Sequence, residues 1–228
     1  MQNEAEGDKT MNMTTHINAN PWDTGTDELE RLALEECVKR QRIDHRVSVL
    51  VIADKHCDLA PRFARLEAEV ILADQPQFHQ EIEGRILASG RRDQISYVAT
   101  ELTALPERFA GQPFDIIVVR HGLCALPYAE ARSVIRNLLL RLRIGGKLYL
   151  SVLGLHSELS QGYADGEATI DQRFAPLAPA LAKKYGIHHP VCLYTERNLF
   201  MVLLEAGASV LRTLTTTYGN VKGVAVRV

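Results

Sequence analysis

Short apolar segments alternate with stretches of helical periodicity from residue 47 onwards, and this alternation limits the folds open to the chain. Val47–Ile52 and Phe114–Val119 are apolar enough to be buried on both faces of a sheet. Glu69–Ala73, Ile95–Ala99 and Lys147–Val152 predict three further strands. Strands separated by helices form βαβ units with right-handed crossovers, so the pattern predicts a parallel sheet with helices on both faces.

The spacing of apolar residues also predicts the connecting helices. Leu59–Leu66, residues 77–88 and Tyr128–Leu142 have helical periodicity, and the Gly145-Gly146 pair is expected to end the last of them. Another helix, with an acidic first turn, is expected to begin near Thr26. Because it precedes the first strand, we expect it to cover either the sheet or a site.

The end of the chain has a different pattern. Thr195–Ala206 predicts a helix that Gly207 caps. Ser209–Thr215 and Val221–Val228 predict two strands, and the turn Tyr218-Gly219-Asn220 between them is suited to a hairpin. The predicted fold class is therefore α/β, with a doubly wound, seven-stranded, mostly parallel sheet whose last strand is antiparallel.

The chain is expected to divide into a tail and one domain. Residues 1–24 are polar and lack periodicity, which predicts a flexible tail. Residues 25–228 have the length of a single domain. Within them, residues 154–194 break the βαβ pattern and predict an insert. An irregular stretch of this length is usually a lid, a binding loop or a partner surface.

Composition narrows the possible partners. The chain is 46% apolar and 24% charged, which is typical of a soluble globular protein. Its net charge of -2 argues against nucleic acid, because phosphate binding needs a basic excess. Four widely spaced cysteines predict reduced thiols in a cytoplasmic protein. No apolar run predicts a membrane helix, and the N-terminus has no signal-peptide pattern.

Four segments at the joints of the βαβ pattern carry a family resemblance. They are Glu101-Leu-Thr-Ala-Leu-Pro106, Phe114-Asp-Ile-Ile-Val-Val-Arg-His-Gly-Leu123, Leu142-Arg-Ile-Gly-Gly-Lys-Leu-Tyr-Leu150 and Tyr194-Thr-Glu-Arg-Asn-Leu-Phe-Met-Val-Leu-Leu-Glu-Ala-Gly207. In this order the segments resemble those of the class I S-adenosylmethionine-dependent methyltransferases, particularly the small-molecule type. The resemblance covers about residues 30–228 and implies a Rossmann-like methyltransferase fold with S-adenosylmethionine as cofactor.

The first turn of the pattern departs from the family. In such sheets the ligand lies beyond the carboxyl end of the first strand, where glycines let backbone amides approach it. This chain has Ala53, Lys55 and Cys57 at the glycine positions, and Val51 where the family often has an acid. The resemblance implies that Ala53 and Asp54 bind cofactor, with Asp54 taking the role of the missing acid. Ala53 and Cys57 preserve binding if they adopt ordinary dihedrals, and Lys55 is the least compatible replacement.

Two further acids occupy positions that the family uses. Asp74 follows the second strand, where the resemblance implies a carboxylate that accepts hydrogen bonds from both ribose hydroxyls. Glu101 follows the third strand, where it implies contact with the adenine amino group. The alternatives are a solvated turn acid at Asp74 and a helix N-terminal acid at Glu101.

The catalytic group is less clearly marked. His121 follows the fourth strand, at the rim where an acceptor would bind, and is the candidate base. Its alternative role is to cap the strand end. His188 and His189 are adjacent, but no third ligand is evident, so no metal site is predicted.

Two functions fit these observations. The first is an active methyltransferase whose small-molecule acceptor binds beneath residues 154–194. The second is a non-catalytic relative that serves as a binding, regulatory or assembly module, with 154–194 as a surface for a protein partner or with the chain as a homo-oligomer. Fold analogy alone does not choose between them.

Overall fold

The computed structural model describes residues 28–42, 45–54, 56–110 and 113–228. The predicted N-terminal tail and the expected helix start at Thr26 lie outside the described residues. The helices and strands follow one another in the order α1 (Glu28–Arg40), β1 (Ser48–Ile52), α2 (Ala60–Arg65), β2 (Glu69–Asp74), α3 (His79–Ala88), β3 (Ile95–Ala99), β4 (Phe114–Arg120), α4 (Tyr128–Arg141), β5 (Leu142–Val152), α5 (Pro179–Tyr185), α6 (Glu196–Glu205), β6 (Ser209–Thr215) and β7 (Val221–Val226).

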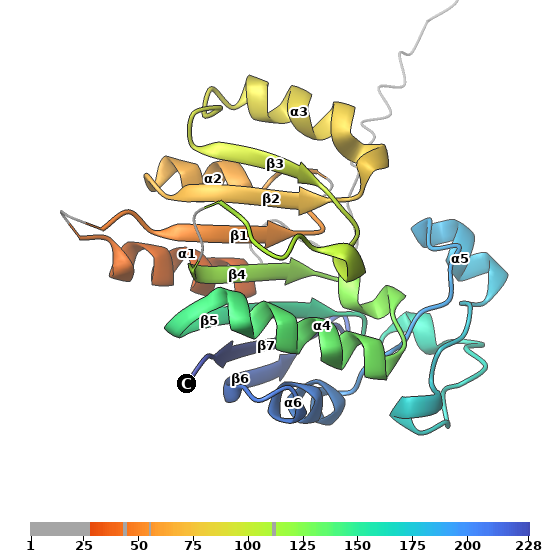
Figure 1. The fold of residues 1–228 in the computed structure, drawn as a ribbon. Coiled ribbons are helices and arrows are strands. Elements are labelled where there is room, and N and C mark those ends of the chain that lie inside the picture. Colours follow the sequence, from red (N-terminus) through yellow and green to blue (C-terminus); the bar gives the residue numbers. More distant parts are fainter. Residues whose placement is uncertain (1–27, 43–44, 55, 111–112) are drawn as a thin grey trace, which may run out of the picture.

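Seven strands form one sheet in the order β3-β2-β1-β4-β5-β7-β6. The pairs among β1 to β5 are parallel, whereas β7 is antiparallel to both of its neighbours, β5 and β6. The predicted fold class and the predicted antiparallel last strand are therefore confirmed. Because β1 to β5 are parallel, their carboxyl ends lie along one edge of the sheet, at the arrowheads in Figure 1.

Helices cover both faces of the sheet, with α1, α2 and α3 on one face and α4 and α6 on the other (Figure 1). Strand β1 contributes to both cores. Val49 and Val51 pack on the side of α1 to α3, while Leu50 and Ile52 pack on the side of α4 and α6. Every residue of β1 is buried, which explains why its sequence is an uninterrupted apolar run.

The glycine pair at 145–146 lies inside a strand, so the prediction that it ends a helix is wrong. Helix α4 ends at Arg141, and β5 begins with the next residue. Gly145 has a φ of 75°, and its N–H donates to the carbonyl oxygen of Arg227 at 2.8 Å. The register between β5 and β4 shifts here. The glycines thus permit a β-bulge at the start of β5.

Residues 154–194 are folded, although no regular element was predicted there. They contain α5, which begins with Pro179 and ends before Gly186, a residue with a φ of 65°. Proline at the first position and glycine just past the end are common helix boundaries, so these two residues were the available sequence signal.

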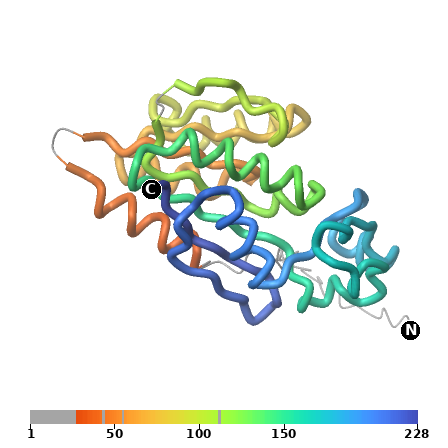
Figure 2. Tube along the Cα trace, turned by 60° about the horizontal axis from the view of Figure 1, so that its bottom comes forward, coloured from red at the N-terminus to blue at the C-terminus, as the bar shows by residue number. Residues whose placement is uncertain are grey.

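Backbone hydrogen bonds tie the last segment of the insert to the domain. The N–H of Tyr194 donates to the carbonyl of Leu153 at 2.9 Å, and the N–H of Cys192 donates to the carbonyl of Cys124 at 2.8 Å. The insert forms a lobe at one end of the molecule in Figure 2. It lies beyond the end to which β4 and β5 point (Figure 1), so it borders the edge where a ligand is expected.

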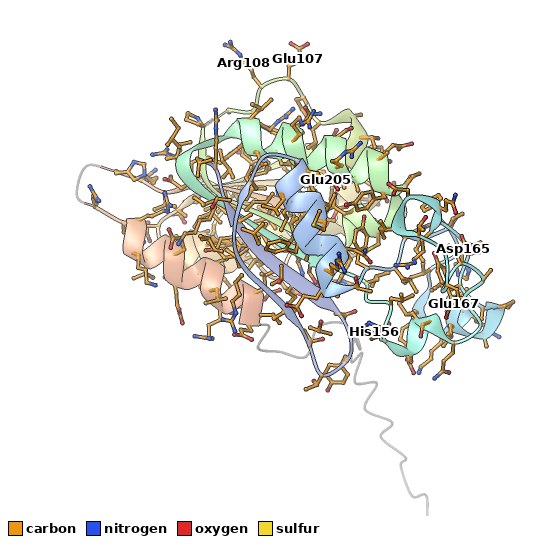
Figure 3. The ribbon with its side chains drawn as sticks, turned by 90° about the horizontal axis from the view of Figure 1, so that it is seen from below. Glu107, Arg108, His156, Asp165, Glu167 and Glu205 are labelled. Atoms are coloured by element: carbon orange, nitrogen blue, oxygen red, sulfur yellow. The ribbon has the colours of Figure 1, made fainter. Side chains whose placement is uncertain are left out.

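Charged side chains lie on this lobe. Figure 3 shows His156, Asp165 and Glu167 on it, far from Glu107 and Arg108 on the loop before β4.

Among the described residues, no helix is long and apolar enough to cross a bilayer. The same residues contain no group of three or more His, Cys, Asp or Glu side chains arranged to hold a metal ion.

The contact between the start of the insert and the final hairpin generates a prediction. A Cβ on Gly154 would lie 1.6 Å from the carbonyl oxygen of Gly219, so Gly154→Ala is expected to lower the free energy of unfolding by about 2–3 kcal/mol. A Cβ on Gly84, in α3, would meet nothing within 4 Å, so Gly84→Ala is expected to raise stability by about 0.5–1 kcal/mol. Urea unfolding of both variants tests this, and equal effects would contradict the packing argument.

Candidate functional site

The candidate site lies where the order of the strands reverses. From β1 the chain proceeds outwards to β2 and β3, then returns to β4 on the other side of β1. In open α/β sheets, ligands bind at the carboxyl ends of the strands beside such a switch point. Residues at or just beyond the ends of β1, β2, β3 and β4 therefore form the candidate site, and the predicted residues Ala53, Asp54, Asp74, Glu101 and His121 are among them.

The turn after β1 has a backbone that normally requires glycine. Ala53 has a φ of 60° and Cys57 a φ of 48°. From the sequence we expected cofactor binding to be preserved if both residues had ordinary dihedrals, and neither residue does. The described residues include four non-glycine residues with positive φ, and three of them, Ala53, Cys57 and His121, lie at this edge. A left-handed conformation costs a residue with a Cβ about 1–2 kcal/mol. The third replaced position, Lys55, lies outside the described residues.

A glycine elsewhere makes room for the extra methyl group of Ala53. The position that a Cβ on Gly122 would occupy lies 3.3 Å from the Cβ of Ala53 and 3.3 Å from Cδ2 of Leu102. Gly122 comes after β4, so the two loops that border the switch point approach each other closely. The absence of a side chain at Gly122 thus leaves room for the methyl group of Ala53.

The side chain of Asp54 is buried beneath the turn's neighbours. Its Oδ1 accepts a 2.7 Å hydrogen bond from Nη1 of Arg120, and its Oδ2 accepts from the N–H of Leu59 at 3.0 Å. Nη2 of Arg120 lies 3.3 Å from Glu30 on α1, and Glu30 also pairs with Arg62 on α2 at 2.7 Å. The side chains of Asp54, Arg120 and Glu30 are 0%, 10% and 10% exposed.

The contacts of Asp54 occupy the carboxylate that the family resemblance assigns to the cofactor. Burial raises the pKa of the Asp54 carboxyl, and the charge of Arg120 and the N–H of Leu59 oppose that shift. Both carboxylate oxygens already have donors, so the side chain supports the turn from inside. A direct contact between Asp54 and cofactor stays a prediction.

Asp74 and Glu101, at the ends of neighbouring strands, are connected through Gln75. Oδ1 of Asp74, which is buried, accepts from the N–H of Gln75 at 2.8 Å. The side-chain amide of Gln75 donates to Oε2 of the exposed Glu101, also at 2.8 Å. The N–H of Thr100 donates to the carbonyl of Asp74 at 2.9 Å, which joins the two strand ends. The result is a pair of carboxylates at one edge, able to accept hydrogen bonds from hydroxyl or amino groups of a ligand.

His121 lies at the end of β4, half-buried and with a φ of 56°. Its N–H donates to the carbonyl of Ser151 at 2.8 Å, and its Nε2 is 2.9 Å from the hydroxyl of Ser151. Ser151, on β5, therefore fixes both the backbone and the ring of His121. Cys57 brings a thiol to the neighbouring turn, but burial raises its pKa to about 12, so it stays protonated at neutral pH and is no nucleophile.

Sequence reasoning missed Arg120, Gln75, Ser151 and Gly122. A charged residue at the end of the apolar strand Phe114–Val119 was the available signal for Arg120. Its partners lie 66 and 90 positions earlier in the chain, so only the fold reveals them.

Solved structures with similar folds are methyltransferases. The CcbJ methyltransferase from Streptomyces caelestis has a TM-score of 0.64 at 13% identity, over 89% of this chain and 90% of that one. The glycopeptide N-methyltransferase MtfA, solved with S-adenosylmethionine, has a TM-score of 0.60 at 18% identity, over 90% and 96%. The chain has the class I S-adenosylmethionine-dependent methyltransferase fold. The fold predicted from the resemblance is thus confirmed.

Some structures with this fold are much longer than this chain, and the sequence similarity is low. An O-methyltransferase family protein from Burkholderia thailandensis has a TM-score of 0.59 at 17% identity over 87% of this chain. This chain spans 56% of that protein's length. No protein-family model and no curated sequence matches the chain. At these identities the likeness establishes the fold, and the ligand must be argued from the site.

The contact between Ala53 and Gly122 can be tested by a double-mutant cycle. Gly122→Ala places a second methyl against Ala53 and is expected to lower the free energy of unfolding by about 1–2 kcal/mol. Ala53→Gly removes the first methyl and its left-handed strain, so the double variant should recover most of that loss. The measurement is the urea midpoint of the four proteins. Effects that add within about 0.3–0.5 kcal/mol would show that the two positions are independent.

Proposed function

We propose that this protein binds S-adenosylmethionine at the carboxyl edge of β1 to β4 and transfers its methyl group to a small molecule. The observation that carries the proposal is the left-handed backbone at Ala53, Cys57 and His121. Strained dihedrals cluster where function over-determines the backbone. The turn after β1 has kept a glycine-type shape without its glycines, which supports continued use of that shape.

The two carboxylates supply the adenosine contacts in this proposal. Asp74 accepts hydrogen bonds from the ribose hydroxyls, and Glu101 accepts one from the adenine amino group. Gln75 supports this assignment, because its backbone and its side chain connect the two acids. The backbone of Ala53 lies against the amino-acid part of the cofactor.

Methyl transfer by direct displacement mainly requires that donor and acceptor are held in line. When the acceptor is a hydroxyl or amine, a base that removes its proton assists the reaction. His121 takes this role in the proposal, with Ser151 orienting its ring. The acceptor lies between this edge and the lobe 154–194. Four buried free cysteines support a reducing compartment such as the cytoplasm.

A second candidate function is a non-catalytic module. The observation that favours it is Arg120, whose guanidinium joins the end of β4 to the turn after β1, near the expected position of the methionine part. If this ion pair and the methyl of Ala53 close that space, the protein retains the methyltransferase fold without its reaction, and the lobe 154–194 serves a protein partner or a second copy.

Titration with the product S-adenosylhomocysteine tests cofactor binding, and Asp74 provides the decisive variant. Asp74→Ala should weaken binding by about 1.5–3 kcal/mol, roughly 10- to 150-fold, through lost charge-assisted hydrogen bonds. Glu69→Ala is the matched control, because Glu69 lies on the same strand, β2, at its opposite end. Calorimetry that shows no heat for the wild-type protein would favour the non-catalytic candidate.

Catalysis requires a separate measurement. With methyl-labelled S-adenosylmethionine and a panel of hydroxyl and amine acceptors, the wild-type protein should form labelled product. His121→Gln should lower kcat about 100-fold, in the usual range for a general base, with little change in cofactor affinity. A His121→Gln variant with unchanged kcat would remove His121 from the catalytic role.

A further inference from the structure

The turn after β1 poses a physical problem, because two residues with a Cβ hold dihedrals that glycine would adopt more easily. With His121 they are three of the four left-handed non-glycine residues among the described residues, and only the fourth, Glu67, lies outside the site. An unconstrained turn would relax to ordinary dihedrals. Some interaction must therefore stabilise the strained conformation.

Asp54 is the residue through which such an interaction acts. It directly follows Ala53, and its carbonyl accepts a 2.6 Å hydrogen bond from the N–H of Cys57. Its carboxylate accepts from the N–H of Leu59, at the start of α2. Asp54 thus follows one left-handed residue directly and is hydrogen-bonded to the other and to the start of α2. Fixing this one side chain constrains both left-handed residues.

Arg120 fixes Asp54 from across the switch point. Their 2.7 Å ion pair is almost entirely shielded from water, and Glu30 of α1 binds the same guanidinium from another element. Breaking a buried ion pair leaves an uncompensated charge, which costs more than a surface pair contributes. This penalty is large enough to oppose relaxation of the turn.

We propose that Arg120 is a positioning residue for the cofactor turn, which it holds, through Asp54, in the shape that glycines would otherwise permit. The role rests on the proposed function, since the turn matters because cofactor binds there. Arg120 acts through Asp54 and needs no contact with the reacting atoms. Glycines would allow the left-handed dihedrals without strain, whereas Arg120 stabilises these dihedrals through an ion pair.

The proposal predicts rescue by glycine. Arg120→Gln should accelerate amide hydrogen exchange at Cys57 and Leu59 at least 10-fold and weaken S-adenosylhomocysteine binding about 10-fold. Adding Ala53→Gly and Cys57→Gly to this variant should return the affinity to within about threefold of wild type, because glycine needs no support in the left-handed region. A residue with a merely structural role would gain nothing from glycines in another loop.

A variant in a more exposed ion pair controls for the loss of an arginine charge as such. Arg132 pairs with Glu205 at 3.0 Å between α4 and α6, and Glu205 is marked on α6 in Figure 3. Arg132→Gln should leave both exchange at Leu59 and ligand affinity within twofold of wild type. If Arg120→Gln does not fold, Asp54→Asn carries the test, because its amide oxygen still accepts from Leu59 while the ion pair is lost.

The outcomes separate this proposal from the proposed function. If wild-type protein does not bind S-adenosylhomocysteine, the proposed function is contradicted. The exchange measurement then still tests whether Arg120 holds the turn. Unchanged exchange in Arg120→Gln overturns the positioning role. Faster exchange with lost affinity that the two glycines fail to restore also overturns it, because Arg120 would then contact the ligand itself.

Discussion

The ion pair between Asp54 and Arg120 is the contact on which the geometry of the site depends. It joins the turn after β1 to the end of β4, the two strands between which the chain reverses its order in the sheet. Through Glu30 it also ties this point to α1. A parallel sheet brings strand ends together but does not fix the turns beyond them. In this protein a buried pair of charges performs that task.

Residues outside the turn leave room for the side chains that it carries in place of glycine. The methyl of Ala53 is tolerated because position 122 is itself glycine, and a Cβ there would lie only 3.3 Å away. The turn therefore has left-handed dihedrals like those of a glycine-rich turn, but it is stabilised by contacts with neighbouring residues. Because residues outside the turn hold its conformation, we expect substitutions at positions 30, 120 or 122 to affect it.

Much of the fold was predictable because its causes are local. Strands buried on both faces need continuous apolar sequence, and a hairpin needs a turn such as Tyr218-Gly219-Asn220, so β1, β4 and the antiparallel β7 could be inferred directly. The glycine pair at 145–146 was misassigned, because glycine permits both a helix end and a β-bulge, and pairing with Arg227 decides between them.

The site was only partly predictable, because some of its features have local causes and others depend on distant residues. Asp74 and Glu101 each come after a strand, and a parallel sheet must bring such residues to one edge. The dihedrals of Ala53 and the partner of Asp54 depend instead on residues far away in the sequence, which no local pattern encodes.

The attachment of the lobe 154–194 to the domain bears on the proposed reaction. Its return segment is bonded to the end of β5 through Leu153 and to the turn after His121 through Cys124, so it shares its supports with the candidate base. The lobe and His121 are therefore held by neighbouring parts of the same backbone. If the proposed reaction takes place at this edge, the lobe that would cover the acceptor and the residue that would act as base are both supported by β5, whose Ser151 contacts the imidazole of His121.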